Sequence, residues 1–126
     1  MNVKLDTKEK FSVITPFEKE VSAIMTEELE ELLHSFLNKG IPHLVLKMSE
    51  VEILAPEVAE MIASVQQEFY ENNRSFVVCN LQEGPEKLLD EMGLLEFMNV
   101  TPTESEAWDI VQMEEIEREL LNDYEE

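Results

Sequence analysis

The two histidines and the single cysteine of this chain are the first side chains to consider for metal or nucleophilic chemistry. His34 falls on the expected outer side of a helix and His43 at the start of a strand. No cysteine lies near either, so the spacing of a zinc site is absent. Cys79 lies in an apolar run, residues 76–81, where a buried and inert thiol is the usual outcome. We therefore expect solvated or locally capped histidines and no metal site.

Pairs of carboxylates occur at helical spacing, for example Glu27 with Glu31 and Glu57 with Glu60. With 29 acidic residues such pairs arise by chance. A catalytic pair also needs one buried member, which an all-polar helix face does not favour. The three glycines are scattered and form no phosphate-binding loop. The sequence therefore predicts a protein that is not an enzyme and that binds no cofactor.

The charge of the chain limits the classes of partner that it can bind. Nine lysines and arginines against 29 aspartates and glutamates give a formal net charge of −20, which repels nucleic-acid phosphates and anionic membrane surfaces. The sequence has no basic-apolar leader and no apolar run of roughly 18 residues, and its single cysteine excludes an internal disulfide. We expect a cytoplasmic protein without membrane insertion, whose partners are proteins.

Acidic residues are concentrated at the end of the chain. Residues 103–126 carry ten of them against Arg118 alone. Two interpretations stay open: a solvated helix face that runs into a frayed end, or a surface that docks on a basic partner. We expect a folded domain over residues 1–112 and an acidic extension of the last helix over residues 113–126.

The elements that position these residues follow from hydrophobic periodicity. Alternation of apolar and polar residues predicts a hairpin of two short strands, residues 3–5 and 11–15. Residues 17–25 show no clean period, so we expect a loop there. Continuous apolar runs, typical of strands covered on both faces, predict strands at residues 44–48, 76–79 and 97–100.

Two helices are expected on either side of the central strand at residues 44–48. The first spans residues 27–39, with Thr26 as its N-cap and Gly40 as its stop. The second begins at Pro56, because a proline costs no hydrogen bond at the first helical position. It should end near residues 72–73.

Two more helices are expected in the last third of the chain. A short one lies between Gly84 and Gly93, and a long one follows Thr103 and Glu106, which have the spacing of a capping box. The long helix carries Ile110, Met113, Ile116 and Leu120 on one stripe, with Ala107 and Val111 beside it, and we expect Trp108 and Met113 in the core.

Strands followed by repeated alternation of helix and strand indicate an α/β fold. We expect a mixed sheet of about five strands, parallel in its later part, with about four helices and a long acidic C-terminal helix. Partners of such sheets bind beyond the carboxyl ends of the strands. Residues 49–56 follow the central strand at that edge, so we expect function there.

The order of these elements and four local patterns resemble the STAS domain, the family of sulfate-transporter cytoplasmic domains and anti-sigma factor antagonists. The patterns are HLVLKMSEVE at residues 43–52, SFVVCNL at 75–81, EKLLDEMGLLEF at 86–97 and ESEAW at 104–108. The resemblance covers residues 3–111. It implies the family's α/β fold and a regulatory role through protein binding.

Family members that act as anti-sigma factor antagonists carry an Asp-Ser-Ser-Gly turn at the start of helix two, and an anti-sigma kinase phosphorylates its second serine. Alignment through residues 51–54 replaces these four residues by Ala55, Pro56, Glu57 and Val58. Glu57 is then either a structural carboxylate that suits the helix dipole or a fixed charge that imitates phosphoserine. Ser49 stays open as another phosphate acceptor.

A second departure from the family lies upstream. Members often have a Gly-x-Leu-Asp loop after strand two that touches the kinase, and residues 17–25 hold neither that glycine nor a matching aspartate. This weakens the expectation of binding the usual kinase in the usual way. Asn80 and Gly84 are still expected on the same edge as Glu57.

The leading hypothesis is a regulatory module that binds a protein partner through the edge formed by residues 17–25, 49–58 and 80–85, here called the rim. The partner is a protein such as an anti-sigma or serine kinase. One alternative is an accessory subunit that docks on the ATPase of a membrane transporter, and another is a homodimer paired through the last helix. The partner-binding residues implied are Phe17, Ser49, Glu50, Leu54, Ala55, Pro56, Glu57, Val58, Asn80 and Gly84.

Overall fold

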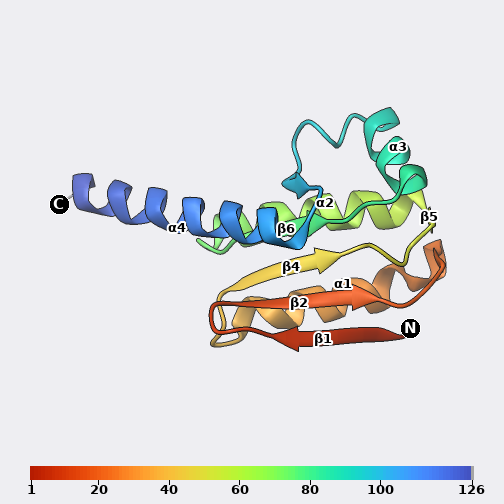
Figure 1. Ribbon diagram of the computed structural model, residues 1–126, viewed down its shortest axis with the longest axis horizontal. Helices are drawn as coiled ribbons and strands as arrows, with labels where there is room; N and C mark the ends of the chain where they lie inside the picture. Colours follow the sequence, from red (N-terminus) through yellow and green to blue (C-terminus); the bar gives the residue numbers. More distant parts are fainter. Residues whose placement is uncertain (126) are drawn as a thin grey trace.

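A computed structural model describes residues 1–125 of the chain and the side chains of residues 1–121. At its centre lies a five-stranded sheet in the order β1-β2-β4-β6-β7 (Figure 1). Its strands are β1 (Val3–Thr7), β2 (Phe11–Pro16), β4 (His43–Lys47), β6 (Phe76–Cys79) and β7 (Val100–Thr101). β1 is antiparallel to β2, and every later pair is parallel. The expected mixed α/β sheet is confirmed.

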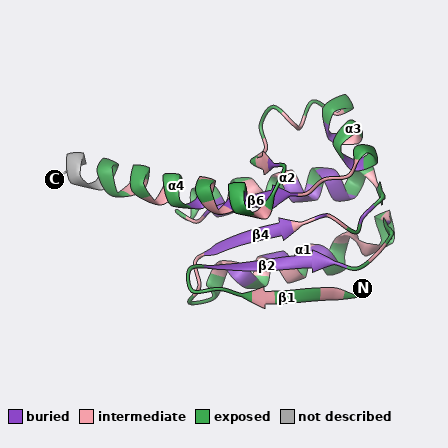
Figure 2. Cartoon of the chain, viewed as in Figure 1, coloured by how far each residue is buried: buried purple, intermediate pink, exposed green. Residues whose placement is uncertain are grey.

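Helices cover both faces of this sheet (Figure 1). They are α1 (Thr26–Ser35), α2 (Pro56–Glu71), α3 (Glu83–Glu91) and α4 (Glu104–Glu125). Leu44 and Leu46 of β4 belong to the apolar core that includes α1 and α2, whereas Val45 belongs to a second core with Ala107 and Val111 of α4. The alternation of side chains along a strand thus produces one core on each face. Figure 2 shows β2 and β4 buried along almost their whole length.

A second, smaller sheet lies beyond one end of the main sheet. β3 (Glu20–Val21) pairs in parallel with β5 (Ile53–Leu54), and the 3-10 helix η1 (Ala23–Met25) follows β3. The expectation of a plain loop at residues 17–25 is therefore wrong. Strands of two residues are too short to show a period of two, so the sequence carried no signal for them.

The boundaries of the middle helices agree with expectation. Pro56 is the first residue of α2, and Asn72 caps its end. α3 begins at Glu83, one residue before Gly84, and Gly93 follows it with a φ of 72°, a conformation that glycine adopts without a steric cost.

The first helix was wrongly bounded at both ends. α1 begins at Thr26 itself, whose hydroxyl donates a hydrogen bond to the Ala23 carbonyl (2.7 Å) instead of capping the helix. After Ser35 the chain tightens into the 3-10 helix η2 (Phe36–Asn38). Gly40 does not stop the helix, because Lys39 is already extended with a ψ of 155°.

The last strand and the last helix differ more from the sequence-based expectation than the first helix does. The expected strand at residues 97–100 is the shorter β7, and Phe97 is 85% exposed. Thr103 caps α4 as expected, because its hydroxyl accepts the Glu106 N–H at 3.1 Å. The expectation that Met113 lies in the core is wrong, because Met113 is more than half exposed, as are Ile116 and Leu120 of the same stripe.

The face of α4 that contacts the sheet carries the small residues Ala107 and Val111, both fully buried. Trp108 lies beside them and stacks on Phe11, with ring centroids 4.9 Å apart. Helical geometry places the exposed stripe on the opposite side of α4. Among the described residues, no helix has the length and apolar character needed to cross a membrane.

Candidate functional site at the rim

The backbone joins the first two segments of the rim. The N–H groups of Glu52 and Ile53 donate to the Lys19 carbonyl at 2.8 and 3.1 Å, and the Ala55 N–H donates to the Val21 carbonyl at 3.0 Å. These bonds continue the pairing of β3 with β5. Residues 17–25 and 49–58, which are far apart in the sequence, therefore form one edge beyond the carboxyl end of β4.

The third segment joins the same edge through close backbone contact. The Gln82 side chain donates to the Ser49 carbonyl at 2.6 Å. A Cβ added to Gly84 would lie 2.6 Å from the Glu52 carbonyl oxygen, so α3 approaches β5 more closely than any other residue type permits. Asn80 leaves β6 with a positive φ of 58°, a conformation that asparagine tolerates well.

The implied partner-binding residues divide into accessible and buried ones. Leu54 and Val58 are 7% and 0% exposed and belong to the core, so they hold the rim in place from beneath. The accessible ones, fully or partly, are Phe17, Ser49, Glu50, Ala55, Pro56, Glu57, Asn80 and Gly84. The structure thus brings the three predicted segments together and leaves most of the implied residues open to a partner.

Two apolar side chains of the rim were missed by sequence reasoning. Ile24 of η1 is 92% exposed and Ile53 of β5 is 53% exposed, and Phe17 nearby in sequence is 48% exposed. Exposed apolar side chains gathered on one edge are typical of protein-binding surfaces. Both residues lie in segments without a helical or strand period, so hydrophobic periodicity carried no signal of their exposure.

Glu57 lies in the first turn of α2 and is exposed. The N-cap residue of this helix is Ala55, which has no side-chain acceptor, and its carbonyl accepts the N–H groups of Val58 and Ala59 at 3.0 and 3.1 Å. A carboxylate at Glu57 faces the positive end of the helix dipole, which stabilises the helix without any partner. The exposed position of Glu57 also leaves its carboxylate open to a partner that recognises a negative charge.

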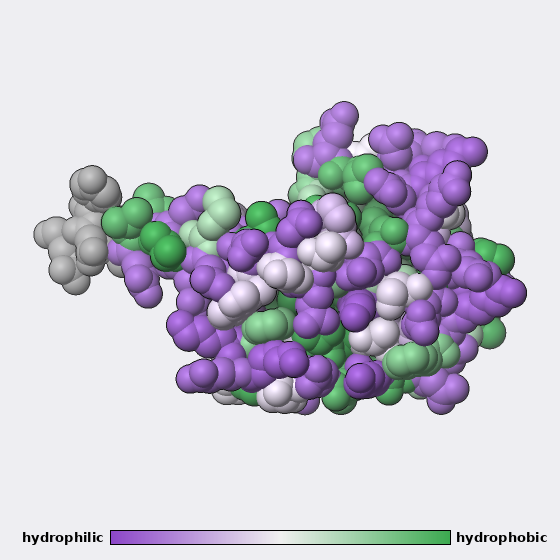
Figure 3. Space-filling model, in the orientation of Figure 1, coloured by the Kyte–Doolittle hydropathy of each residue, from purple (hydrophilic) through white to green (hydrophobic). Residues whose placement is uncertain are grey.

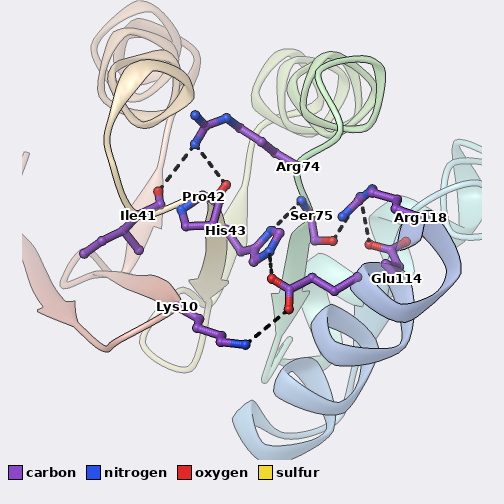
Figure 4. A network of polar contacts seen from close by, with 9 residues as sticks. Lys10, Ile41, Pro42, His43, Arg74, Ser75, Glu114 and Arg118 are labelled. Carbon is purple, nitrogen blue, oxygen red and sulfur yellow. Dashed lines mark hydrogen bonds and ion pairs between the residues drawn. The ribbon is translucent and has the colours of Figure 1, made fainter. Parts of the chain in front are cut away.

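A polar network occupies the opposite end of the sheet (Figure 4). His43 at the start of β4 is 3% exposed, and its Nδ1 accepts the backbone N–H of Ser75 at 3.0 Å. Its Nε2 lies 2.8 Å from Glu115 of α4. Because a backbone N–H can only donate, Nδ1 carries no proton, and the proton of the neutral ring lies on Nε2 and is donated to Glu115.

The protonation states in this network follow from burial and hydrogen bonding. Burial lowers the pKa of His43, and the hydrogen bond from His43 lowers the pKa of the Glu115 carboxyl. Both shifts favour a neutral imidazole beside an ionised carboxylate. Lys10 lies 3.6 Å from the other oxygen of Glu115 and adds to its stabilisation.

Arg118 continues the network along α4. It donates to the Ser75 hydroxyl at 3.1 Å and pairs with Glu114 at 3.8 Å. Arg74, one residue before Ser75, donates to the carbonyls of Lys39 and Pro42 (3.1 and 3.3 Å). The contacts of His43 with Glu115 and of Arg118 with Ser75 hold α4 against the amino ends of β4 and β6. We call these four residues the clamp. Sequence reasoning missed this role of His43.

The remaining side chains that could react, Cys79 and His34, are buried or paired within the protein. Cys79 is fully buried between the sheet and α4, and burial raises the pKa of its thiol to about 12, with the Glu104 carboxylate adding to the rise. His34 pairs with Glu68 across α1 and α2 at 3.0 Å. Among the side chains of residues 1–121, no cluster of three or more histidine, cysteine or acidic groups is arranged to hold a metal ion.

Comparison with known proteins shows which family has this architecture. The family model of the STAS domain matches residues 2–107. No curated protein matches the sequence of the chain. An anti-sigma factor antagonist from Mycobacterium paratuberculosis has a similar structure, with a TM-score of 0.77 at 19% identity over 88% of this chain and 93% of that one.

Two further solved structures extend the comparison. The Bacillus anti-sigma factor antagonist SpoIIAA matches in its unphosphorylated form with a TM-score of 0.70 at 16% identity over 88% of this chain and 96% of that one, and it also matches in its phosphorylated form. The murine anion transporter solute carrier 26 family member A9 matches with a TM-score of 0.64 at 12% identity, over 82% of this chain and 18% of that one. At these identities the similarity concerns the fold.

Proposed function

The chain belongs to the STAS domain family, and from that membership we propose that it is a non-enzymatic regulatory module that binds a protein partner through its rim. The observation that supports this most directly is the rim itself. Backbone hydrogen bonds join two of its segments there, the Gln82 side chain joins the third through its hydrogen bond to the Ser49 carbonyl, and Phe17, Ile24 and Ile53 remain exposed. A surface built in this way has a fixed backbone and free side chains, as recognition of a protein requires.

Partner exchange in this protein is proposed to proceed without phosphorylation at the start of α2. The resemblance to anti-sigma factor antagonists implies that Glu57 corresponds to their phosphorylated serine, and a glutamate cannot accept a phosphate. Its carboxylate supplies one negative charge, against about −1.5 to −2 for phosphoserine. Glu57 then acts as a fixed charge that sets the choice of partner, at a helix start where a negative charge is stable.

A second candidate function is an accessory subunit of a membrane transporter. The observation that favours it is the match to an anion transporter over 82% of this chain but 18% of the transporter chain, which indicates that this fold also occurs as a part of transport proteins. The rim would then dock on a cytoplasmic ATPase. Recovery of the protein with a membrane fraction distinguishes this function from that of a regulator, which stays with the cytoplasmic proteins.

The test of the proposed function is a quantitative pull-down from the native cytoplasm with wild-type, Ile53→Ser and Glu57→Ser proteins. Ile53→Ser should lose the specific partner at least about tenfold, because it removes an exposed apolar contact near the centre of the rim. The control is Leu5→Ser, since Leu5 is similarly exposed (50%) but lies on the edge strand β1. Equal loss in both variants would contradict a role for the rim.

Glu57→Ser separates the two interpretations of Glu57. If the charge selects the partner, this variant should recover a different set of proteins or recover the partner only when a kinase and ATP phosphorylate the new serine. If it recovers the same partner to the same extent, Glu57 is structural. Mass spectrometry of the native protein checks Ser49, because a phosphate there would replace the proposed fixed charge by a switch at a neighbouring position.

A further inference from the structure

The outward side of α4 carries an apolar stripe that nothing in the described structure covers. Met113, Ile116 and Leu120 are 56%, 56% and 54% exposed. Their spacing of three and four residues aligns them along one side of a helix, opposite Ala107 and Val111, which face the sheet. The C-terminal half of α4 extends past the sheet (Figure 1), and hydrophobic side chains are visible on this projecting part (Figure 3).

The charges around this stripe are almost all negative. Asp109, Glu117 and Glu119 are exposed beside it. The one basic residue of α4, Arg118, is turned toward the body of the molecule, where it contacts Ser75 and Glu114. The stripe therefore presents an apolar seam between acidic borders.

We propose that this seam of Met113, Ile116 and Leu120 is a second docking surface, separate from the rim, that binds a basic amphipathic helix of a partner protein. Such a helix would place apolar side chains against the seam and lysines or arginines against its acidic borders. The proposal is independent of the function assigned to the rim, because the rim lies beyond the carboxyl ends of the strands and the seam projects past their amino ends.

Charge and area together favour this occupant over a second copy of the chain. In a dimer paired through this seam, the acidic borders of the two copies would face each other whether the helices ran parallel or antiparallel. Each copy also carries a net charge of −20, so the two copies would repel each other. A stable interface needs about 800 Å² from each partner, which three side chains on one helix do not supply. Attraction between opposite charges must therefore contribute, and a basic partner provides it.

The surroundings of α4 explain how the seam is kept in position. The clamp of His43, Glu115, Arg118 and Ser75 and the stacking of Trp108 on Phe11 hold the first part of the helix against the sheet. The seam is consequently presented on a helix that is already formed, so a partner need not order it. Preorganisation of this kind reduces the entropic cost of binding.

The test uses the full chain and a fluorescent synthetic helix of the same length as α4, 22 residues, with leucines on one side and lysines on the others. Fluorescence anisotropy measures its affinity for the wild type and for Ile116→Ser/Leu120→Ser. The double variant should bind at least about tenfold more weakly, a difference of about 1.4 kcal/mol. Both side chains are exposed, so the variant should fold, as circular dichroism will show.

Controls separate the seam from general attraction between acid and base. Leu5→Ser and the rim variant Ile53→Ser should bind the peptide like the wild type. About 0.5 M NaCl should weaken the wild-type complex at least about tenfold. A peptide in which serines replace the leucines should lose the dependence on Ile116 and Leu120.

Two outcomes overturn the proposal. If the double variant binds the leucine-lysine peptide as tightly as the wild type, the peptide recognises charge alone and the seam is not a docking surface. If sedimentation equilibrium shows that the wild type dimerises at tens of micromolar while the double variant is a monomer, the occupant of the seam is a second copy.

Discussion

The two ends of the sheet hold their neighbouring segments by opposite means. At the carboxyl end, backbone groups join the rim: the Lys19 and Val21 carbonyls accept hydrogen bonds from the segment around β5. At the amino end, side chains do this work, since His43 binds Glu115 of α4 and Arg118 binds Ser75. The side chains of the rim consequently remain available to a partner, whereas those of the clamp are occupied by hydrogen bonds within the protein.

This difference separates residues available for recognition from residues needed for stability. A buried side chain that already has its hydrogen-bond partners, such as His43, has no capacity left for a ligand. An exposed apolar side chain such as Ile24 contributes little to the core and remains available to a partner. Polar clusters are often suspected of chemistry, but in this protein the proposed recognition surface is the rim, where side chains make few hydrogen bonds.

The largest stability effect should come from Gly84→Ala at the rim. The added Cβ would meet the Glu52 carbonyl oxygen at 2.6 Å, so α3 or β5 must shift. Alanine normally stabilises a helix by about 0.5–1 kcal/mol relative to glycine, and the clash should reverse that sign and destabilise the protein by about 2 kcal/mol. Urea unfolding followed by the fluorescence of Trp108, the only tryptophan, measures the change.

Gly40→Ala is the matched control for this substitution. Apart from Gly40 itself and its two neighbours in the chain, no residue has an atom within 4 Å of the Cβ position at Gly40. The control should therefore leave stability unchanged or raise it by a few tenths of a kcal/mol, through the smaller entropy of the unfolded chain. Equal stability of the two variants would show that α3 does not rest on the backbone of β5.

The next largest effect should come from the clamp, in Glu115→Leu. Removing the carboxylate leaves the Nε2–H of His43 buried without its acceptor, at a cost of about 1–2 kcal/mol. Cys79 lies beneath α4 and should become more accessible as the helix loosens, so its reaction with a thiol reagent at neutral pH should be faster in the variant. In the wild type, burial and a pKa of about 12 should keep that reaction slow.

Two comparisons make this experiment specific. Glu117→Leu removes an exposed carboxylate from the same helix and should change neither the stability nor the thiol reaction measurably. Glu115→Gln keeps an oxygen that accepts the imidazole N–H and should restore most of the stability. A faster reaction of Cys79 in Ile53→Ser would contradict the separation of rim and clamp.

Much of the rim could be predicted from the sequence, because parallel strands bring their carboxyl ends to one edge. The apolar run of β4, Pro56 at the start of α2 and the glycine of α3 together located it. The pairing of β3 with β5 could not be predicted, since two residues show no period. Its exposed side chains, Ile24 and Ile53, were missed for the same reason.

The clamp could not be predicted, because His43 and Glu115 are 72 residues apart and each has an ordinary explanation by itself. A usable signal was the place of Glu115 on the same side of its helix as Ala107 and Val111. The sequence interpretation instead put Met113, on the most hydrophobic stripe of α4, in the core. Met113 is exposed, because the close approach of this helix to the sheet requires the small residues Ala107 and Val111 at the contact.

The smallest predicted effect is a loss of stability on mild acidification, which should arise at the clamp and not at the rim. Burial holds the pKa of His43 below its ordinary value of 6.5. Below about pH 6.5, His43 therefore binds a proton in the unfolded chain but not in the folded chain, until the pH reaches the lower pKa of the folded state. The stabilising contribution of neutral His43 is complete above that pH and is lost as the pH falls through the folded pKa.

Glu115, whose pKa is lowered, adds a loss of the same sign at more acidic pH, below its ordinary value of 4.5. The other charged groups around His43 are Lys10, Arg74, Glu114 and Arg118. Urea midpoints from the fluorescence of Trp108 at about pH 7.5 and about pH 5.5 measure the loss. In His43→Gln the amide can accept from Ser75 and donate to Glu115 without titrating, so the loss should be smaller. If this variant and the wild type lose equal stability, the acid sensitivity arises elsewhere and the clamp is indifferent to pH.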